Sequence, residues 1–178
     1  MTNSIINTYI FRPAEETDIE SIMQIIYEAQ INLRELKVDQ WQDGYPNLVI
    51  IKNDIENKTA YVLEQNNRVY AYSAIIFNKE KTYEKIYSGK WLSNGEFVVA
   101  HRLAVANNKL KSGLATILLQ HIENLAKSNN IFSFKVDTHE DNLPMNNLLK
   151  KNGFKYCGII YLENGKKRLA YEKIIKNK

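Results

Sequence analysis

The chain has 178 residues, of which 44% are hydrophobic and 11% aromatic, which is enough for one hydrophobic core and too little for two. Its 24 basic and 20 acidic residues give a formal net charge of +4, and the basic residues are spread along the chain. Nucleic-acid binding requires a clustered basic patch or interleaved stacking aromatics, so this distribution disfavours it and suits a small anionic ligand.

The N-terminal half predicts a strand, two helices and a β-hairpin. Thr17-Asp18-Ile19-Glu20 has the form of a capping box in front of a helical pattern that runs from Ile19 to Leu33. Glycine, proline and two large aromatics interrupt the periodicity at 39–46, which predicts an ordered loop. The other elements expected here are a strand at 9–14, a helix at 48–56, and strands at 59–64 and 69–77 around a turn at 65–68.

The C-terminal half predicts alternating strands and helices after an irregular polar segment at 78–95. The elements expected are strands at 98–105, 132–138, 157–162 and 168–174, a helix that begins near Ser112-Gly113, a helix at 144–152, and a hairpin turn at 163–166. The whole series predicts an α/β fold with a mixed, mostly antiparallel central sheet and helices on both faces. We expect a single domain over 1–178, with a core from about 9 to 175.

Targeting and redox signals are sparse. The start of the chain has neither a basic region nor a long apolar run, and no stretch approaches membrane-spanning length. The lone cysteine, Cys157, has no partner for an internal disulfide, and no Cys/His spacing indicates a metal site. We therefore expect a cytoplasmic protein that has no membrane contact and binds no metal.

The segment 98–126 carries the strongest functional signal, because an apolar strand leads through a short basic loop into an amphipathic helix. The first turn of a helix has unpaired N–H donors and a partial positive charge, and Lys109 and Lys111 add full charges beside it. This arrangement predicts a binding site for an anionic group. Neither a GxxxxGK[ST] nor a GxGxxG motif is present, which disfavours a P-loop kinase and a Rossmann dehydrogenase.

The loop Leu110-Lys111-Ser112-Gly113-Leu114-Ala115 resembles the pyrophosphate loop of the GCN5-related N-acetyltransferases. In that family, Arg or Gln is followed by two residues, Gly, one further residue, and then Gly or Ala. Gly113 and Ala115 fit, and such small residues let the diphosphate of coenzyme A approach the backbone. Leu110 replaces the usual Arg or Gln, which removes one side-chain contact and leaves the backbone donors intact.

The resemblance covers essentially the whole chain. Residues 9–14 are similar to the family's opening strand, and 142–154 are similar to its fourth helix and the LYEKxGF ending. The resemblance implies that the strands carrying His101 and Val136 run parallel and splay apart, which admits the pantetheine arm of acetyl-CoA between them. Ligand sites at such a split between strand ends are a general expectation for open sheets.

Acetyl-CoA is therefore the expected co-substrate. Asn142 matches the asparagine with which the family binds the pantetheine arm, and it would serve equally well as a helix cap. Lys151 either meets the 3′-phosphate or is an ordinary solvated lysine. The residues expected to contact the cofactor are Leu103, Ala104, Val105, Lys111, Ser112, Gly113, Leu114, Ala115, Thr116, Asn142 and Lys151.

Acetyl transfer from a thioester to an amine requires a neutral nucleophile, stabilisation of the oxyanion, and a proton for the departing thiolate. His101 is the first candidate for the base, because the family often carries its base on this strand and an imidazole has an ordinary pKa of about 6.5. A histidine packed in the core is the alternative. Glu96, just before the strand, is the second candidate, although such a glutamate is more often merely solvated.

The backbone N–H of Leu103 or Ala104 is expected to polarise the acetyl oxygen, at the point where the family's strand is bulged. The family's proton donor for the thiolate is a tyrosine on the fourth helix, but Leu149 stands at that position. This leaves Tyr156, another tyrosine, water, or no acid at all, since a thiolate of pKa about 8.5 is a tolerable leaving group. Catalysis would then be mostly positioning.

The acceptor pocket is expected to be built from the N-terminal helices and the irregular segments, which vary within such a fold. Trp41, Tyr45 and Trp91 are its candidate residues, although large aromatics in loops also serve to anchor those loops. His139 faces either the cofactor or solvent. Cys157 is expected to be a small packed residue and not a nucleophile.

These observations predict an acetyl-CoA-dependent N-acetyltransferase that acts on a primary amine of a small molecule or peptide by direct attack in a ternary complex. Leu149 and Leu110 suggest an alternative, a non-catalytic sensor of acetyl-CoA or CoA. A third alternative, a weak nucleic-acid binder, is supported only by the small excess of basic over acidic residues. Whether the chain forms a homodimer is left open.

Overall fold

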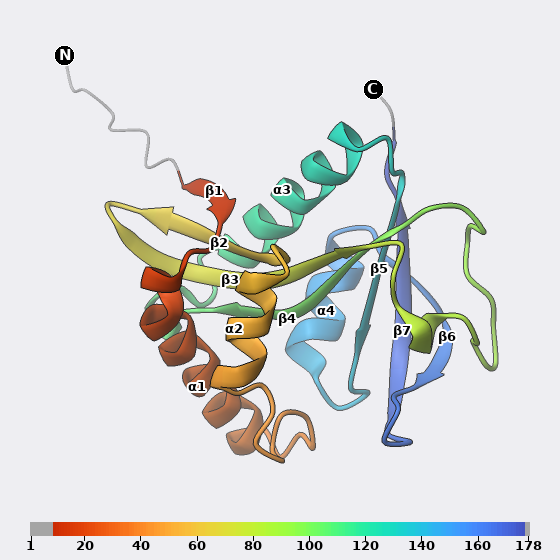
Figure 1. The fold of residues 1–178 in the computed structure, drawn as a ribbon. Coiled ribbons are helices and arrows are strands. Elements are labelled where there is room, and N and C mark those ends of the chain that lie inside the picture. Colours follow the sequence, from red (N-terminus) through yellow and green to blue (C-terminus); the bar gives the residue numbers. More distant parts are fainter. Residues whose placement is uncertain (1–8, 177–178) are drawn as a thin grey trace.

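A seven-stranded sheet is the centre of the computed structural model, which describes residues 9–176 (Figure 1). The strands are β1 (Ile10–Pro13), β2 (Ala60–Gln65), β3 (Arg68–Phe77), β4 (Val98–Val105), β5 (Ser133–Thr138), β6 (Lys155–Tyr161) and β7 (Lys167–Ile174). Their order is β1-β2-β3-β4-β5-β7-β6, and all neighbours pair antiparallel except β4 and β5. The predicted mixed, mostly antiparallel sheet is therefore confirmed.

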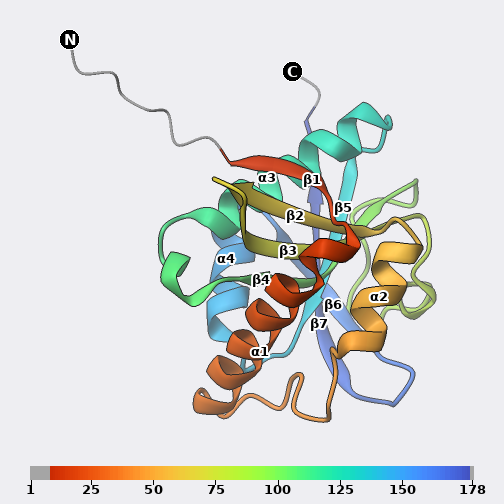
Figure 2. The ribbon, with the colours of Figure 1, turned by 60° about the vertical axis from the view of Figure 1, so that its left-hand side comes forward.

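Helices cover both faces of this sheet (Figure 2). They are α1 (Ile19–Glu35), α2 (Leu48–Glu56), α3 (Leu114–Ser128) and α4 (Leu143–Lys151). On one face, α1 and α2 bury Ile22 and Ile51 against strand residues such as Val62. On the other, α3 and α4 bury Leu118 and Leu149. Each helix thus turns one apolar stripe to the sheet, as its periodicity predicts.

The predicted capping box at the start of α1 is wrong. A 3₁₀ turn, Glu16–Asp18, precedes the helix, and the side chain of Asp18 makes no cap to it. Its carboxylate instead accepts a hydrogen bond from the backbone N–H of Glu15 at 2.8 Å and pairs with Arg12 of β1 at 2.7 Å. The four-residue motif at 17–20 could not indicate this ion pair, because Arg12 lies outside the motif.

β4 and β5 pair only at their first residues, Val98 with Phe134 and Val99 with Lys135. Beyond these pairs, β4 stays with β3 while β5 stays with β7, so the two parallel strands separate (Figure 1). α3 connects the two strands and begins near the open end of the split. The predicted splayed pair is confirmed.

The segment between β3 and β4 lies over the sheet instead of extending into solvent. It contains a 3₁₀ turn, Lys81–Tyr83, and it is fastened by Glu172 of β7, a fully buried carboxylate. Glu172 accepts hydrogen bonds from the backbone N–H of Leu92 at 2.5 Å and from the hydroxyl of Ser133 at 2.7 Å. Because buried carboxylates are costly unless hydrogen-bonded, this anchor fixes the segment against the strands.

Residues 9–176 contain neither a helix that could span a membrane nor a cluster of metal ligands. None of the helices there combines the length and apolar character needed to cross a bilayer. In the same range, no three His, Cys, Asp or Glu side chains gather in a way that could hold a metal ion.

Candidate functional site

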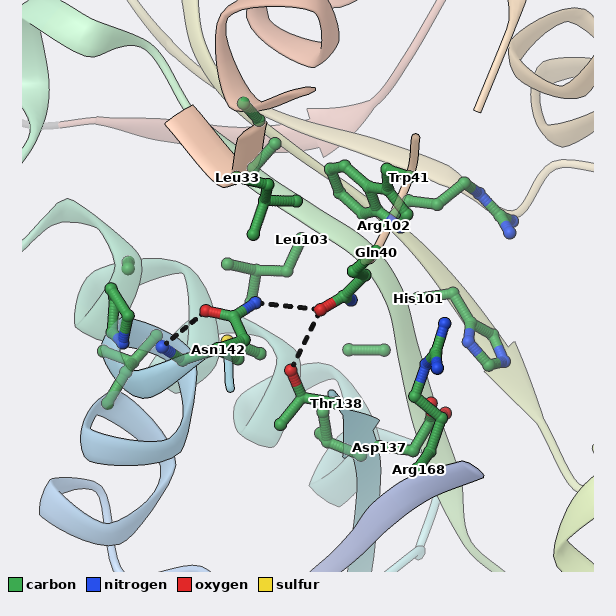
Figure 3. A pocket seen from close by; sticks show the side chains of 18 of the residues that line it. Leu33, Gln40, Trp41, His101, Arg102, Leu103, Asp137, Thr138, Asn142 and Arg168 are labelled. Carbon is green, nitrogen blue, oxygen red and sulfur yellow. Dashed lines mark hydrogen bonds between the residues drawn. The ribbon is translucent and has the colours of Figure 1, made fainter. Parts of the chain in front are cut away.

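A cleft of about 1180 Å³ follows the split between β4 and β5 (Figure 3). Its walls come from β4, from the start of α3, from α4, from the loop between α1 and α2, and from the β6–β7 hairpin. Clefts that bind small molecules usually measure about 300–1,000 Å³. This one therefore has room for an extended ligand and a second molecule beside it.

The start of α3 forms one end of the cleft. Gly113 is its N-cap, with φ 85°, and the first helical hydrogen bond runs from Ile117 N–H to the Gly113 carbonyl at 3.1 Å. The N–H groups of 114–116 therefore lie outside the helical ladder. A Cβ at Gly113 would meet no atom within 4 Å, so the approach to these donors is open. The predicted helix start is confirmed within one residue.

Three lysines line the same end: Lys109, Lys111 and Lys151. Lys109 Nζ lies 4.7 Å from the centre of the Tyr70 ring, which orients its charge at the cleft wall. Ser112 does not line the cleft, because its hydroxyl donates to the Lys109 carbonyl at 2.6 Å and closes the turn. The helix dipole and these charges together favour an anion here.

β4 is bulged beside the cleft. Tyr72 pairs with Ala104 and Ala74 pairs with His101, so Ser73 of β3 faces two residues of β4, Arg102 and Leu103. Arg102 has φ 55°, which is unusual for a residue with a side chain. A bulge takes backbone groups out of the ladder. Here the two residues without a partner on β3, Arg102 and Leu103, both line the cleft.

A buried cluster holds Arg102 in this conformation. Its guanidinium donates twice to Asp54 of α2, at 2.7 and 2.8 Å, and once to the hydroxyl of Tyr45 at 2.6 Å. Asp54 also accepts the hydroxyl of Tyr72 at 2.5 Å. Burial and the Asp54 carboxylate raise the pKa of Tyr72 well above its ordinary value. Such an over-determined network can maintain a strained backbone at a functional site.

His101 is paired with a carboxylate that the sequence interpretation missed. Its Nε2 lies 2.6 Å from Oε2 of Glu80, and both residues line the cleft. Burial works to raise the pKa of Glu80, but hydrogen bonds from His101 and Thr82 outweigh it and lower the pKa to about 2. Glu80 is thus an anion at neutral pH. When Nε2–H donates to it, Nδ1 of the neutral imidazole is free to accept a proton.

Gln40, from the loop after α1, reaches across the cleft (Figure 3). Its Oε1 accepts from Nδ2 of Asn142 at 3.0 Å and from the hydroxyl of Thr138 at 3.5 Å. Oδ1 of Asn142 meanwhile accepts the N–H of Met145 at 3.2 Å and so caps α4. The helix-cap reading of Asn142 is therefore confirmed, while its contact with the pantetheine arm stays a prediction.

The structure does not bring every predicted residue to the cleft. Trp41 and Tyr45 line it, whereas Glu96, Tyr156 and Trp91 do not. Glu96 is exposed and accepts a hydrogen bond from Asn78 at 3.2 Å. Tyr156 is half exposed at the far strands.

Trp91 serves to anchor its loop. Its Nε1–H donates to the Tyr83 carbonyl at 2.9 Å, and its ring lies 4.4 Å from Lys135 Nζ. Cys157 is buried, and burial raises the pKa of its thiol. Leu149, at the position of the expected tyrosine, is fully buried in the core. The other predicted cofactor residues, Leu103, Ala104, Val105, Lys111, Gly113, Leu114, Ala115, Thr116, Asn142 and Lys151, all line the cleft.

The comparisons with known proteins agree with this geometry. The family model described as Acetyltransferase (GNAT) family matches residues 20–154. A solved acetyltransferase of the GNAT family from Streptococcus agalactiae is 38% identical, with a TM-score of 0.86 over 95% of this chain and 96% of that one. Among proteins of curated function, no match is found.

Two more distant structures share the fold. A GNAT-family acetyltransferase from Listeria monocytogenes is 19% identical with a TM-score of 0.72, over 94% of this chain and 95% of that one. The ribosomal-protein-S18-alanine N-acetyltransferase from Escherichia coli is 13% identical with a TM-score of 0.64, over 96% of each chain. At these identities the likeness concerns the architecture alone.

Proposed function

The chain belongs to the acetyltransferase (GNAT) family, and we propose that it moves an acetyl group from acetyl-CoA to a primary amine of a small molecule or peptide. The attack is direct, in a ternary complex, within one domain of about residues 9–175. The observation that carries this proposal is the alignment of three features along one cleft. They are the free N–H groups and lysines at the start of α3, which we call the α3 anion site, the bulge of β4, and the His101–Glu80 pair.

The cleft residues fit the co-substrate. The free N–H groups at Gly113 and beyond, together with Lys111, suit its diphosphate. Asn142 suits an amide of the pantetheine arm, whose carbonyl would take the place that Oε1 of Gln40 occupies. Acetyl-CoA supplies the activated thioester. Lys151 is the proposed contact for the 3′-phosphate, since it lines the same cleft.

The bulged strand supplies electrostatic stabilisation. When the amine nitrogen attacks, negative charge develops on the acetyl oxygen, and a fixed backbone donor lowers the free energy of that state. The N–H of Leu103 is the proposed donor, because the bulge at Arg102 removes it from the β3 ladder. The clamp of Asp54 and Tyr45 on Arg102 keeps the donor in place.

His101 is the proposed general base. An amine of ordinary pKa about 10.4 must lose a proton before it attacks, which at pH 7 costs roughly 4–5 kcal/mol. Nδ1 of His101 accepts that proton, directly or through one water, and Glu80 stabilises the imidazolium that forms. The C–N bond forms and the C–S bond breaks. The nitrogen then loses its second proton to solvent, and the thiolate takes up a proton from solvent. No tyrosine of α4 takes part, because Leu149 fills that position in the core.

Release of free CoA tests the proposal. Purified protein, acetyl-CoA and a library of primary amines are mixed, and the thiol is followed with a thiol-reactive dye. We expect turnover with at least one amine, and acetyl-CoA should raise the melting temperature. Binding without turnover on any amine would instead indicate a sensor. Absence of any stabilisation by acetyl-CoA would contradict both functions.

Replacing Gly113 with leucine should weaken CoA binding by about 30-fold, because a side chain there fills the approach to the diphosphate and φ 85° is costly for leucine. Isothermal titration with CoA measures the effect. Gly165→Leu is the matched control, since Gly165 also has positive φ, 78°, and open space around its Cβ position. Equal losses in the two variants would contradict the diphosphate site.

A further inference from the structure

A buried guanidinium faces the cleft beside the proposed base. Arg168 lies on β7, and its side chain extends into the cleft near His101 and Asp137 (Figure 3). The residue is only 6% exposed. Within residues 9–176, no carboxylate forms an ion pair with it. An arginine that is buried to this degree is usually paired with an anion. Because Arg168 lines the cleft, a bound molecule can supply that anion.

The donors of Arg168 are mostly free. A guanidinium has five N–H groups, and the hydrogen bond that Arg168 makes is from Nη1 to the Lys167 carbonyl at 2.8 Å. In the described part of the chain, the sole fully buried side-chain N or O atom without a partner is Nε2 of Gln65. Nε and Nη2 of Arg168 therefore keep some exposure to solvent, and the residue lines the cleft.

The neighbouring acidic groups are already engaged. Asp137 of β5 pairs with Ala170 of β7, so it shares a sheet face with Arg168, two residues from Ala170. Its Oδ1 accepts the hydroxyl of Tyr83 at 2.6 Å. Glu80 is engaged with His101. The acceptor end of the cleft thus has two carboxylates that attract an incoming ammonium and one guanidinium that attracts an anion.

We propose that Arg168 binds a carboxylate of the acceptor, so that the acceptor is a small, amino-acid-like molecule whose carboxylate lies within a few bonds of the acetylated amine. A guanidinium and a carboxylate form two parallel hydrogen bonds, which fix both position and orientation. The bound carboxylate holds the amine beside His101, and Arg168 takes no part in the bond changes. This inference rests on the proposed acetyl transfer.

Matched substrates test the inference. Phenylalanine, its carboxamide and phenethylamine share one side chain and differ in the carboxylate, and lysine with cadaverine gives a second series. We expect kcat/KM for each amino acid to exceed that for the analogues that lack the carboxylate by about 30-fold or more. Equal use of all members of each series by the unaltered protein would overturn the inference and leave the proposed function standing.

Variants assign the preference to Arg168. Arg168→Met should remove the preference for the carboxylate, mainly by raising KM, and Arg168→Lys should retain part of that preference. Arg68→Met, at an exposed arginine at the start of β3, should leave the preference unchanged. Titration of the CoA complex with N-acetyl-phenylalanine gives a readout independent of turnover. Retained affinity in a folded Arg168→Met protein, or in Arg168→Gln if the first does not fold, would refute the site. If no amine is acetylated, the proposed function fails, and the titration still decides on Arg168.

Discussion

Replacement of His101 by alanine is expected to lower kcat/KM for acetyl transfer by about 10²- to 10³-fold, the usual contribution of a positioned general base. Affinity for acetyl-CoA should stay nearly unchanged, because the α3 anion site lies at the other end of the cleft.

His121→Ala is the matched control. His121 lies on α3, stacks on Phe11 with ring centres 5.1 Å apart, and does not line the cleft. Its loss removes a histidine of similar burial without touching the proposed reaction centre, so kcat/KM should change by less than about twofold. A His101→Ala protein whose rate matches that of the control would remove His101 from the mechanism.

Glu80→Gln separates positioning from proton transfer. Glutamine has a single acceptor oxygen, so it can accept from His101 or from Thr82 but not from both, and it lacks the negative charge that favours the imidazolium. We expect a loss of about tenfold in kcat, measured at saturating acetyl-CoA. A merely structural role for Glu80 would lower the melting temperature and leave kcat of the folded protein unchanged.

Those parts of the site that depend on local sequence could be predicted. The apolar spacing from Leu114 onward fixes the start of α3, because a helical face and its first free N–H groups are set within a few residues. The loop after β4 follows directly, so the anion site needs no long-range contact. The start of α4 at Asn142 is local in the same way, since the cap bond to Met145 spans three residues.

The catalytic end of the cleft depends on contacts between distant segments. Glu80 belongs to an irregular stretch whose position is set by Glu172, a residue some 90 positions further on in the chain. No local pattern reports that contact. Glu96 is the second candidate for the base because it adjoins the strand of His101, but sequence proximity does not decide on which side of the sheet a loop residue lies. Trp91 is a candidate for the acceptor pocket because its side chain is large, but a large side chain is equally suited to anchoring a loop.

One signal in the sequence did mark the buried cluster. Asp54 stands three residues after Ile51 on the apolar face of α2, and a charged residue at a core position of a helix requires a partner. The partner, Arg102, is 48 positions away. The sequence alone therefore marks Asp54 as unusual, but only the fold identifies Arg102 as its partner.

Removal of that aspartate should have a large effect on stability. Asp54→Ala leaves the Arg102 guanidinium and the Tyr72 hydroxyl buried without their acceptor, which costs about 3–5 kcal/mol. For a chain of this length, the melting temperature should fall by roughly 6–20 °C. Asp39→Ala is the control, because Asp39 is exposed and its pair with Lys166 spans 3.6 Å, so its loss should cost less than about 1 kcal/mol. Equal melting temperatures for the two variants would contradict this account.

A double variant separates the two roles of the cluster. In Asp54→Leu/Arg102→Met both charges are gone, so no buried charge is left unpaired, although the Tyr72 hydroxyl still lacks its acceptor. Much of the lost stability should therefore return. Acetyl transfer should not return with it, because the proposed oxyanion donor at Leu103 depends on the strained backbone at Arg102, φ 55°, which the ion pair holds. Recovery of both stability and kcat would show that the bulge persists without its clamp. Recovery of stability alone would assign the clamp to catalysis. That role would then explain why a charged pair stands at a position that apolar side chains could fill equally well.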